Sequence, residues 1–257
     1  MTMKNDSPGF SFKLEGHIAS IELCNGQYNH MSTELAGNLA DLLHELDTND
    51  QCRAIVLSGQ GRAFCAGYDF TSEESQSGDP TPFYAQAMRL FDSRKPIVAA
   101  VHGPAIGAGL GLAVLADFRV VCPEARFSAN FNRMGFHPGF GLSMTLPRLI
   151  GIQQAALLFY TGRRIDGAEA LRIGLADSLV DMADIHQHAH ALAEEIAASA
   201  PIAVEATRET LRQGLADEAK RVNQRELELQ RAHFRTADFQ EGIAAMAERR
   251  LPVFRKR

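Results

Sequence analysis

The chain has few of the features that mark membrane, nucleic-acid-binding or secreted proteins. Its longest apolar run begins at Ile97 and is broken by His102 and several glycines, whereas a bilayer-spanning helix needs roughly 20 apolar residues without such breaks. Lys and Arg number 26 against 31 Asp and Glu, and no basic block stands out, which argues against a nucleic-acid partner. The first ten residues, MTMKNDSPGF, contain no apolar segment typical of a secretory signal, so we expect a cytoplasmic protein.

Cysteine is scarce, and the sequence has no pattern typical of a metal site. The cysteines are scattered and form no CxxC pair, which predicts reduced thiols: Cys24, Cys52, Cys65 and Cys122. In the run HQHAH, only His186 and His190 share a helix face. Two histidines without a third ligand are more often surface residues, so we expect no bound metal.

The residues that are present predict an α/β fold. Hydrophobic residues make up 46% of the chain and charged residues 22%, which is enough to bury one large core or two small ones. Alternating residues in 10–24 predict a hairpin that turns near Gly16, and Ser32 or Thr33 caps a helix that runs through Leu46. Further buried strands are expected at 53–59, 97–101 and 118–122, a loop at 72–82, and helices almost throughout after Gly151.

Two glycine-rich segments have the composition of ligand-binding turns. GRAFCAGYDF (61–70) and GPAIGAGLGLAVLAD (103–117) each place small residues where a strand ends and a helix begins. Two such turns brought together could direct two backbone N–H groups at one oxygen, which is an oxyanion hole. Tight packing alone is the alternative explanation for either turn. A dinucleotide fingerprint fails, because GxGxxG would need a glycine where Leu112 stands.

Together these segments resemble the crotonase (enoyl-CoA hydratase/isomerase) superfamily. The resemblance extends in the family's order through FSANFNRMGFHPGFGLSMTLPRLIG (127–151), YTGRRIDGAEALRIGLADSLV (160–180) and DFQEGIAAMAERRLPVF (238–254). It implies a spiral of ββα turns over residues 1–198 and a helical trimerisation region over 199–257. It also implies a homotrimer or a dimer of trimers. The implied substrate is an acyl-coenzyme A thioester, with no separate cofactor.

The resemblance also implies where the substrate binds. The thioester oxygen would be held by the peptide N–H groups of Tyr68 and Ala108. Around these two donors, the matching segments contribute further substrate-binding positions: Ala66, Gly67, Asp69, Gly107 and Gly109. Three positions where members of the family carry acidic residues are without one in this chain: Gly111, Phe131 and Gly139.

Losing these acids should cripple a hydratase unless another group moves the proton, since general acid–base catalysis contributes about 10²–10⁴-fold. His137 is the best substitute in the segment, because its ordinary pKa suits proton transfer at neutral pH. The equally weighted alternative is a histidine that bonds a backbone carbonyl and supports the loop. Glu73 and Glu74, on the expected loop, are further candidates.

Three functions remain open from the sequence. The first is an acyl-CoA enzyme of the hydratase or isomerase type with relocated acid–base groups. The second is a decarboxylase or C–C lyase of the same fold, in which an apolar pocket around Phe131 and Phe136 and the oxyanion hole would suffice. The third is a catalytically silent acyl-CoA-binding protein.

Overall fold

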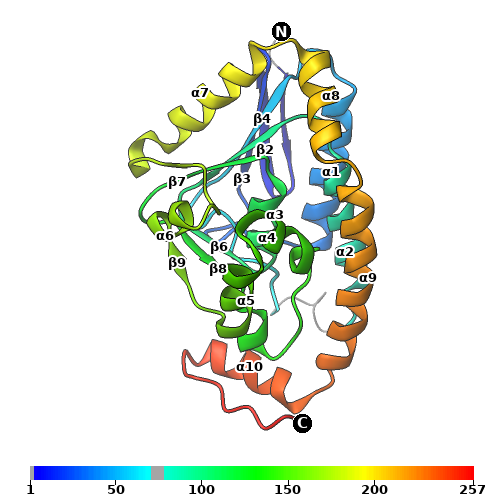
Figure 1. Ribbon diagram of the computed structural model, residues 1–257, viewed down its shortest axis with the longest axis vertical. Helices are drawn as coiled ribbons and strands as arrows, with labels where there is room; N and C mark the ends of the chain where they lie inside the picture. The colour runs from blue at the N-terminus through cyan, green and yellow to red at the C-terminus, as the bar shows by residue number, and fades with distance from the viewer. Residues whose placement is uncertain (1–2, 71–77) are drawn as a thin grey trace.

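The protein is a mixed α/β structure. The computed structural model describes residues 3–70 and 78–257, with side chains from Ser7 onward, so Glu73 and Glu74 lie outside the described residues. In Figure 1 the larger sheet occupies one end of the molecule, and α10 and the C-terminus lie at the opposite end. Within the described residues, no helix has the length and apolar character needed to cross a membrane.

The described residues form a seven-stranded sheet with the order β1-β2-β3-β4-β5-β7-β10. Its strands are β1 (Met3–Ser7), β2 (Phe10–Glu15), β3 (Ile18–Leu23), β4 (Ala54–Gly59), β5 (Ile97–Val101), β7 (Phe118–Val121) and β10 (Ser178–Leu179). The predicted hairpin is confirmed, because Glu15 pairs with Ile18 across the turn at Gly16. From β3 onward the pairs are parallel, as expected for strands connected through helices.

A second, smaller sheet was not predicted from the sequence. It contains β6 (Pro104–Ile106), β8 (Arg126–Ser128) and β9 (Ile165–Asp166). These strands have only two or three residues each, too few to show an alternating pattern. An isolated bridge pairs Cys65 with Ala105, so it places the first glycine-rich segment beside the second, and another pairs Tyr68 of the first segment with Met31.

The helices surround these sheets. They are α1 (Thr33–Asp47), α2 (Thr81–Ala87), α3 (Ala108–Leu115), α4 (Leu142–Ile150), α5 (Ile152–Thr161), α6 (Gly167–Arg172), α7 (Ile185–Ala197), α8 (Pro201–Leu211), α9 (Leu215–His233) and α10 (Ala237–Ala247). The predicted cap of α1 is confirmed, because the Ser32 hydroxyl accepts a hydrogen bond from the Leu35 N–H at 3.1 Å. Short 3-10 helices follow at η2 (Met88–Asp92), η3 (Asn130–Met134) and η4 (Met182–Asp184).

The helical C-terminal region predicted from the sequence is present over 201–247. In Figure 1, α8 and α9 run along one side of the molecule and α10 crosses its lower end. Helix α9 packs against η2 and α4, and α10 packs against η3. The last helices therefore reach the segment 130–142, which the sequence alone could not place.

Helix α3 is buried along its whole length and lies directly on the first glycine-rich segment. A Cβ placed on Gly109 would lie 1.9 Å from the carbonyl oxygen of Cys65. No side chain fits at that distance, so glycine is required by the close approach of two backbones. This contact brings the start of α3 against the main chain near Gly67.

Replacing Gly109 with alanine should therefore destabilise the protein, whereas the same change in another helix should not. Gly37 lies within α1, and its added Cβ would meet only the flexible side chain of Gln86 at 3.4 Å. We expect Gly109→Ala to lower the free energy of unfolding by at least about 2 kcal/mol, because overpacking a rigid core typically costs 1–3 kcal/mol. Gly37→Ala should be neutral or stabilising by up to about 1 kcal/mol, since alanine favours a helix. Urea denaturation of both variants measures this, and a Gly109→Ala protein as stable as wild type would contradict the close backbone contact.

Candidate functional site

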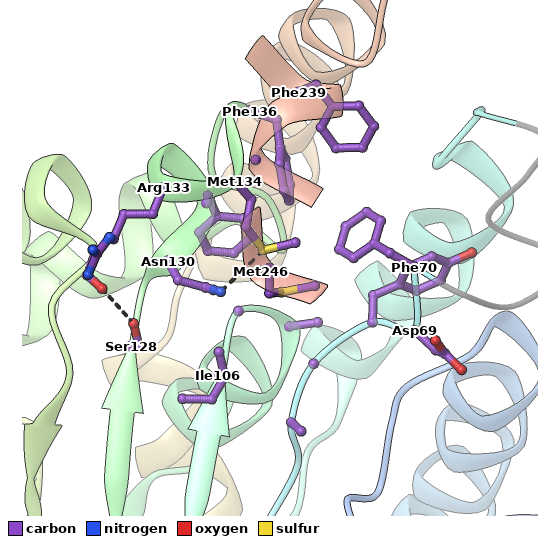
Figure 2. Close-up of a pocket in the computed structure, with 18 of the residues that line it drawn as sticks. Asp69, Phe70, Ile106, Ser128, Asn130, Arg133, Met134, Phe136, Phe239 and Met246 are labelled. Atoms are coloured by element: carbon purple, nitrogen blue, oxygen red, sulfur yellow. Dashed lines mark hydrogen bonds between the residues drawn. The ribbon is translucent and has the colours of Figure 1, made fainter. Parts of the chain in front are cut away.

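A cavity of about 1270 Å³ opens beside the two glycine-rich segments. Its lining comes from the first segment, from the start of α3, from η3 and from the last two helices. Figure 2 shows the side chains around it, with Phe70 on one side, Phe136 and Phe239 above, and Met134 and Met246 towards the centre. The cavity is large enough for an extended small-molecule ligand.

The two glycine-rich segments meet at the wall of this cavity. The Ile106 N–H donates to the carbonyl oxygen of Cys65 at 3.1 Å, which ties β6 to the first segment. Gly67 has φ +95°, and a Cβ placed on it would lie 2.6 Å from the Ile106 carbonyl oxygen and 3.7 Å from the Ala108 nitrogen. The main chain at Gly67 therefore lies against the main chain that begins α3.

This junction has the electrostatics of an oxygen-binding site. Ala108 is the first residue of α3, and the first N–H groups of a helix have no acceptor within the helix. The aligned peptide dipoles add partial positive charge at that end. Gly107 precedes the helix with φ +56°, and its own N–H donates to the Ser128 carbonyl oxygen at 3.0 Å. The arrangement can polarise a carbonyl group that enters beside Gly67.

Most of the substrate-binding positions expected from the sequence line the cavity. They are Ala66, Gly67, Tyr68, Asp69, Gly107, Ala108, Phe131 and Phe136. Three others are not among the lining residues: Gly109, Gly111 and Gly139. Gly109 instead supports the backbone contact under α3, and the remaining two pack against side chains that occupy the space beside them.

Neighbouring side chains fill the space at the acid-free glycines. A Cβ placed on Gly111 would lie 2.6 Å from the ring of Phe140, which is fully buried. A Cβ placed on Gly139 would lie 1.9 Å from the Tyr84 hydroxyl and 2.5 Å from Gln230 Nε2. A glutamate or aspartate at either position would need these neighbours to move. The neighbours can therefore take their positions only because no acid is present.

The interior of the cavity is aromatic. Phe136 forms edge contacts with four other rings, at centroid distances of 5.5 Å to both Phe70 and Phe131, 5.2 Å to Phe234 and 5.7 Å to Phe239. Such tilted and edge-on arrangements are the favoured geometry for aromatic pairs. Phe131 lies in η3, Phe234 directly follows α9 and Phe239 lies in α10. The C-terminal helices therefore complete an apolar chamber around the segment 130–142.

Carboxylates are few in this lining. Among the described lining residues they are Asp69 and Asp79. The pKa of Asp79 is lowered, chiefly by the hydrogen bond from the Thr81 hydroxyl and also by Arg231, so this group stays ionised within its own contacts. Figure 2 shows Asp69 beside Phe70, at the edge of the group of side chains drawn. Asp69 and Asp79 are thus the two carboxylates that the described lining offers for proton transfer.

His137, the histidine favoured as a substitute acid–base group, is not among the cavity-lining residues. Its Nδ1 lies 2.7 Å from the carbonyl oxygen of Pro138, and its backbone N–H donates to His233 Nδ1 at 3.1 Å. Its carbonyl oxygen accepts a hydrogen bond from Gln230 Nε2 at 2.9 Å. These contacts fit the loop-supporting role that was the alternative, so the chemistry proposed below does not use His137.

Arginines gather at the cavity and were not singled out from the sequence as ligand-binding residues. Those that line it are Arg126, Arg133, Arg163, Arg164, Arg249 and Arg250. Arg250 is held by Glu241 and Glu248, whereas Arg126 donates to backbone carbonyls. Guanidinium groups in the lining make the cavity favourable for an anionic part of a ligand.

Two polar residues of the cavity were also missed. Tyr84 in α2 and Gln230 in α9 are 146 residues apart in the chain. The Gln230 amide donates to the Tyr84 hydroxyl at 3.1 Å. Neither lies in a motif. The one indication in the sequence was the absence of an acid at Gly139, whose space they share.

The histidines of HQHAH do not form a metal site in the structure. His190 Nε2 lies 3.3 Å from the Ser20 hydroxyl, and the described residues contain no group of three or more His, Cys, Asp or Glu side chains arranged to bind a metal ion.

Comparison with known proteins reveals relatives along nearly the whole chain. Residues 13–257 match the family described as Enoyl-CoA hydratase/isomerase. YngF of Bacillus subtilis, provisionally named an enoyl-CoA hydratase/isomerase, is 33% identical over 97% of this chain and 98% of its own length. A Thermus thermophilus protein provisionally named an enoyl-CoA hydratase is 35% identical over 93% of this chain and 98% of its own.

Solved structures agree with these sequence relatives. The crystal structure of an enoyl-CoA hydratase/isomerase from Pseudoalteromonas atlantica superposes with a TM-score of 0.88 at 30% identity, covering 96% of this chain and 100% of that one. An enoyl-CoA hydratase/isomerase from Mycobacterium paratuberculosis gives a TM-score of 0.83 at 28% identity, covering 93% and 98%. The predicted α/β fold with its helical C-terminal region is thereby confirmed.

The thiol of Cys65, in the first glycine-rich segment, should be unreactive in the native protein. Burial raises the pKa of the Cys65 thiol to about 12, and it does the same for Cys52. Because the thiolate is the reactive form, only about one molecule in 10⁴ would carry it at about pH 8. Iodoacetamide should label the exposed Cys24 first and leave both buried thiols unmodified until the protein is unfolded. Mass spectrometry of labelled peptides measures this, and rapid native labelling of Cys65 would show that the segment is open.

Proposed function

The chain belongs to the enoyl-CoA hydratase/isomerase family of the crotonase superfamily, and on this premise we propose that it processes acyl-CoA thioesters through an enolate held by backbone amides. The observation that carries the proposal is the contact between Gly67 and the start of α3, where a Cβ on Gly67 would lie 3.7 Å from the Ala108 nitrogen. A thioester carbonyl placed there meets peptide groups from both segments. The relatives' names and the aromatic chamber beside the junction support the same assignment.

The proposed chemistry is electrostatic stabilisation. When a proton leaves the α carbon, or a nucleophile adds to the β carbon, the electron pair moves to the thioester oxygen. The N–H groups of Ala108 and Tyr68 would donate to that oxygen, and the dipole of α3 favours its negative charge. Donors fixed by packed backbone need no reorganisation as this charge develops, which is why such sites accelerate enolate chemistry.

Hydration or isomerisation of an enoyl-CoA is the reaction we favour, because this is the activity after which the relatives are named. The described lining carries only two carboxylates, those of Asp69 and Asp79, so the proton transfers would rely on these groups, on water or on neutral polar groups. The polar groups that occupy the space at Gly139 are those of Tyr84 and Gln230.

Decarboxylation of a malonyl-type thioester is a second candidate, and the carboxylate-poor chamber is the specific observation that favours it. In that reaction the bond between the α carbon and the carboxylate breaks and carbon dioxide leaves. The electron pair of the broken bond stays on the α carbon and forms the enolate directly, so no general base is needed. An apolar wall also destabilises the charged carboxylate relative to the neutral gas that it becomes.

The arginines around the cavity would bind the phosphates of coenzyme A. Phosphate oxygens accept charge-assisted hydrogen bonds from guanidinium groups. Arg163 and Arg164 follow Gly162 on the cavity wall and are exposed, as expected for residues that bind a ligand at the mouth of a pocket. The coenzyme is part of the substrate, and the proposed chemistry requires no other cofactor.

We further propose a homotrimer or dimer of trimers acting in the cytoplasm. Large apolar side chains remain exposed on the helices after Gly151 in the single chain, with exposed fractions of 74% for Ile152, 78% for Tyr160 and 86% for Ile202. Exposed apolar residues of this size commonly mark surfaces that are covered in an assembly.

Removing the N–H of Ala108 tests the oxyanion hole. Proline is tolerated at the first position of a helix and lacks the N–H, so Ala108→Pro removes one donor while keeping the helix start. We expect turnover of crotonyl-CoA, or of malonyl-CoA in the second case, to fall by about 10²–10³-fold, as for loss of one donor in such a hole. Thr33→Pro is the matched control, because Thr33 is the first residue of α1, follows the Ser32 cap and does not line the cavity.

Loss of enoyl absorbance measures the first reaction, release of carbon dioxide measures the second, and circular dichroism checks that both variants are folded. A folded Ala108→Pro protein with wild-type turnover would refute the oxyanion hole. Tight binding of both thioesters by the wild type without turnover of either would support a silent acyl-CoA-binding protein.

Loss of the two adjacent arginines should weaken binding of coenzyme A thioesters specifically. We expect Arg163→Gln/Arg164→Gln to weaken butyryl-CoA binding by about five- to tenfold, because each exposed ionic contact is worth up to about 1 kcal/mol. Binding of butyryl-pantetheine, which has no phosphate, should not change. Arg225→Gln is the control, since Arg225 pairs with Glu228 on α9 and does not line the cavity. Calorimetry measures the affinity of the wild type and of both variants for each ligand, and an equal loss for both ligands would argue against phosphate binding here.

A further inference from the structure

The side-chain pair of Tyr84 and Gln230 is a second polar feature of the cavity, separate from the backbone junction. Tyr84 is 5% exposed and Gln230 is 1% exposed, yet both line the cavity. They meet at Gly139, where a Cβ would lie 1.9 Å from the Tyr84 hydroxyl. The space of a side chain at 139 is therefore taken by a phenol and an amide, which are neutral groups.

The hydrogen bonds of the pair leave one donor and one acceptor available. Gln230 Nε2 donates to the Tyr84 hydroxyl at 3.1 Å and to the His137 carbonyl oxygen at 2.9 Å, so both of its protons are used. Because Tyr84 Oη is the acceptor in this bond, its own proton remains available. Gln230 Oε1 is buried and has no hydrogen-bond partner among the described residues. Buried polar atoms are rarely left in this state, so the pair is suited to a ligand group.

The pair is connected to the proposed thioester site by packed aromatic rings. The ring of Tyr84 is 5.0 Å from that of Phe83, and Phe83 is 5.0 Å from Tyr68. Tyr68 follows Gly67 at the backbone junction, so a chain of three packed rings runs from the proposed thioester site to the Tyr84 hydroxyl. Because the ring of Phe83 separates the pair from that site, the pair suits a substituent on the acyl chain better than the thioester itself.

On these observations, and resting on the proposed acyl-CoA function, we infer that Tyr84 and Gln230 form a donor–acceptor pair that selects acyl groups carrying a hydroxyl. A hydroxyl oxygen can accept the Tyr84 proton while its own proton is donated to Gln230 Oε1. The two residues are thus specificity-determining groups in the place of the acid that Gly139 lacks.

Other acyl substituents match the pair less well. An alkyl chain would leave both polar atoms buried without partners, which costs about 1–3 kcal/mol per group. A carboxylate could accept from Tyr84 but would face Gln230 Oε1, a second acceptor, in an apolar chamber. Burial raises the pKa of Tyr84, chiefly through desolvation, so the phenol keeps its proton at neutral pH and remains a donor.

Binding measurements with matched thioesters test this inference, and they leave out 3-hydroxybutyryl-CoA because it is the product of the proposed hydration. By calorimetry, the wild-type protein should bind 2- or 4-hydroxybutyryl-CoA about tenfold more tightly than butyryl-CoA, the gain expected when a buried donor and acceptor are both satisfied. Tyr84→Phe removes only the hydroxyl and should reduce this preference to less than about threefold, with butyryl-CoA binding retained. Gln230→Met, which has a similar length and no hydrogen-bonding amide, should do the same if Tyr84→Phe fails to fold.

Tyr160→Phe is the matched control, because Tyr160 is 78% exposed on α5 and does not line the cavity; it should keep the wild-type preference. Binding of butyryl-CoA without preference for any hydroxylated analogue would overturn the inference and leave the proposed function standing. Binding of none of the thioesters would overturn both. Tighter binding of malonyl-CoA than of either hydroxybutyryl-CoA would also overturn the inference, because the pair would then recognise a carboxylate.

Discussion

The close approach of α3 to the first glycine-rich segment is the constraint on which the site depends. A Cβ on Gly109 would lie 1.9 Å from the Cys65 carbonyl oxygen, and one on Gly67 would lie 2.6 Å from the Ile106 carbonyl oxygen. Each side of the contact thus requires a residue without a side chain. Because the backbones touch, the first turn of α3 opens beside the main chain of Gly67, and the cavity forms around that junction.

The acid-free segment is held by a helix that lies far away in the sequence. Glu226 is fully buried in α9 and accepts hydrogen bonds from the Gly141 N–H at 2.8 Å and from the Ser143 hydroxyl at 2.6 Å. Gln230, one turn later, binds the His137 carbonyl oxygen. These contacts fix the turn that places Phe140 against Gly111. Several elements are therefore packed around the positions without acids, and an acid introduced at Gly111 or Gly139 would clash with the side chains already there.

Local patterns in the sequence were sufficient for much of the fold but for less of the site. The hairpin, the Ser32 cap and the long buried strands follow from alternation, capping and apolar runs, which act over a few residues. The short strands β6, β8 and β9 were missed because their pairing depends on partners elsewhere in the chain. His137 was favoured because its ordinary pKa suits proton transfer, but its ring contacts the Pro138 carbonyl oxygen and its backbone N–H is held by His233 of α9.

The sequence by itself determined the family, the glycine-rich turns that permit backbone contact, and the positions at which acids are missing. These are properties of residue identity and order. Only the tertiary structure decided what occupies the vacant positions, since Tyr84, Phe140 and Gln230 reach them from separate elements. It also decided that aromatic rings from α9 and α10 close the chamber. The physical reason is that close packing depends on distances between atoms remote in the chain, which local patterns do not encode.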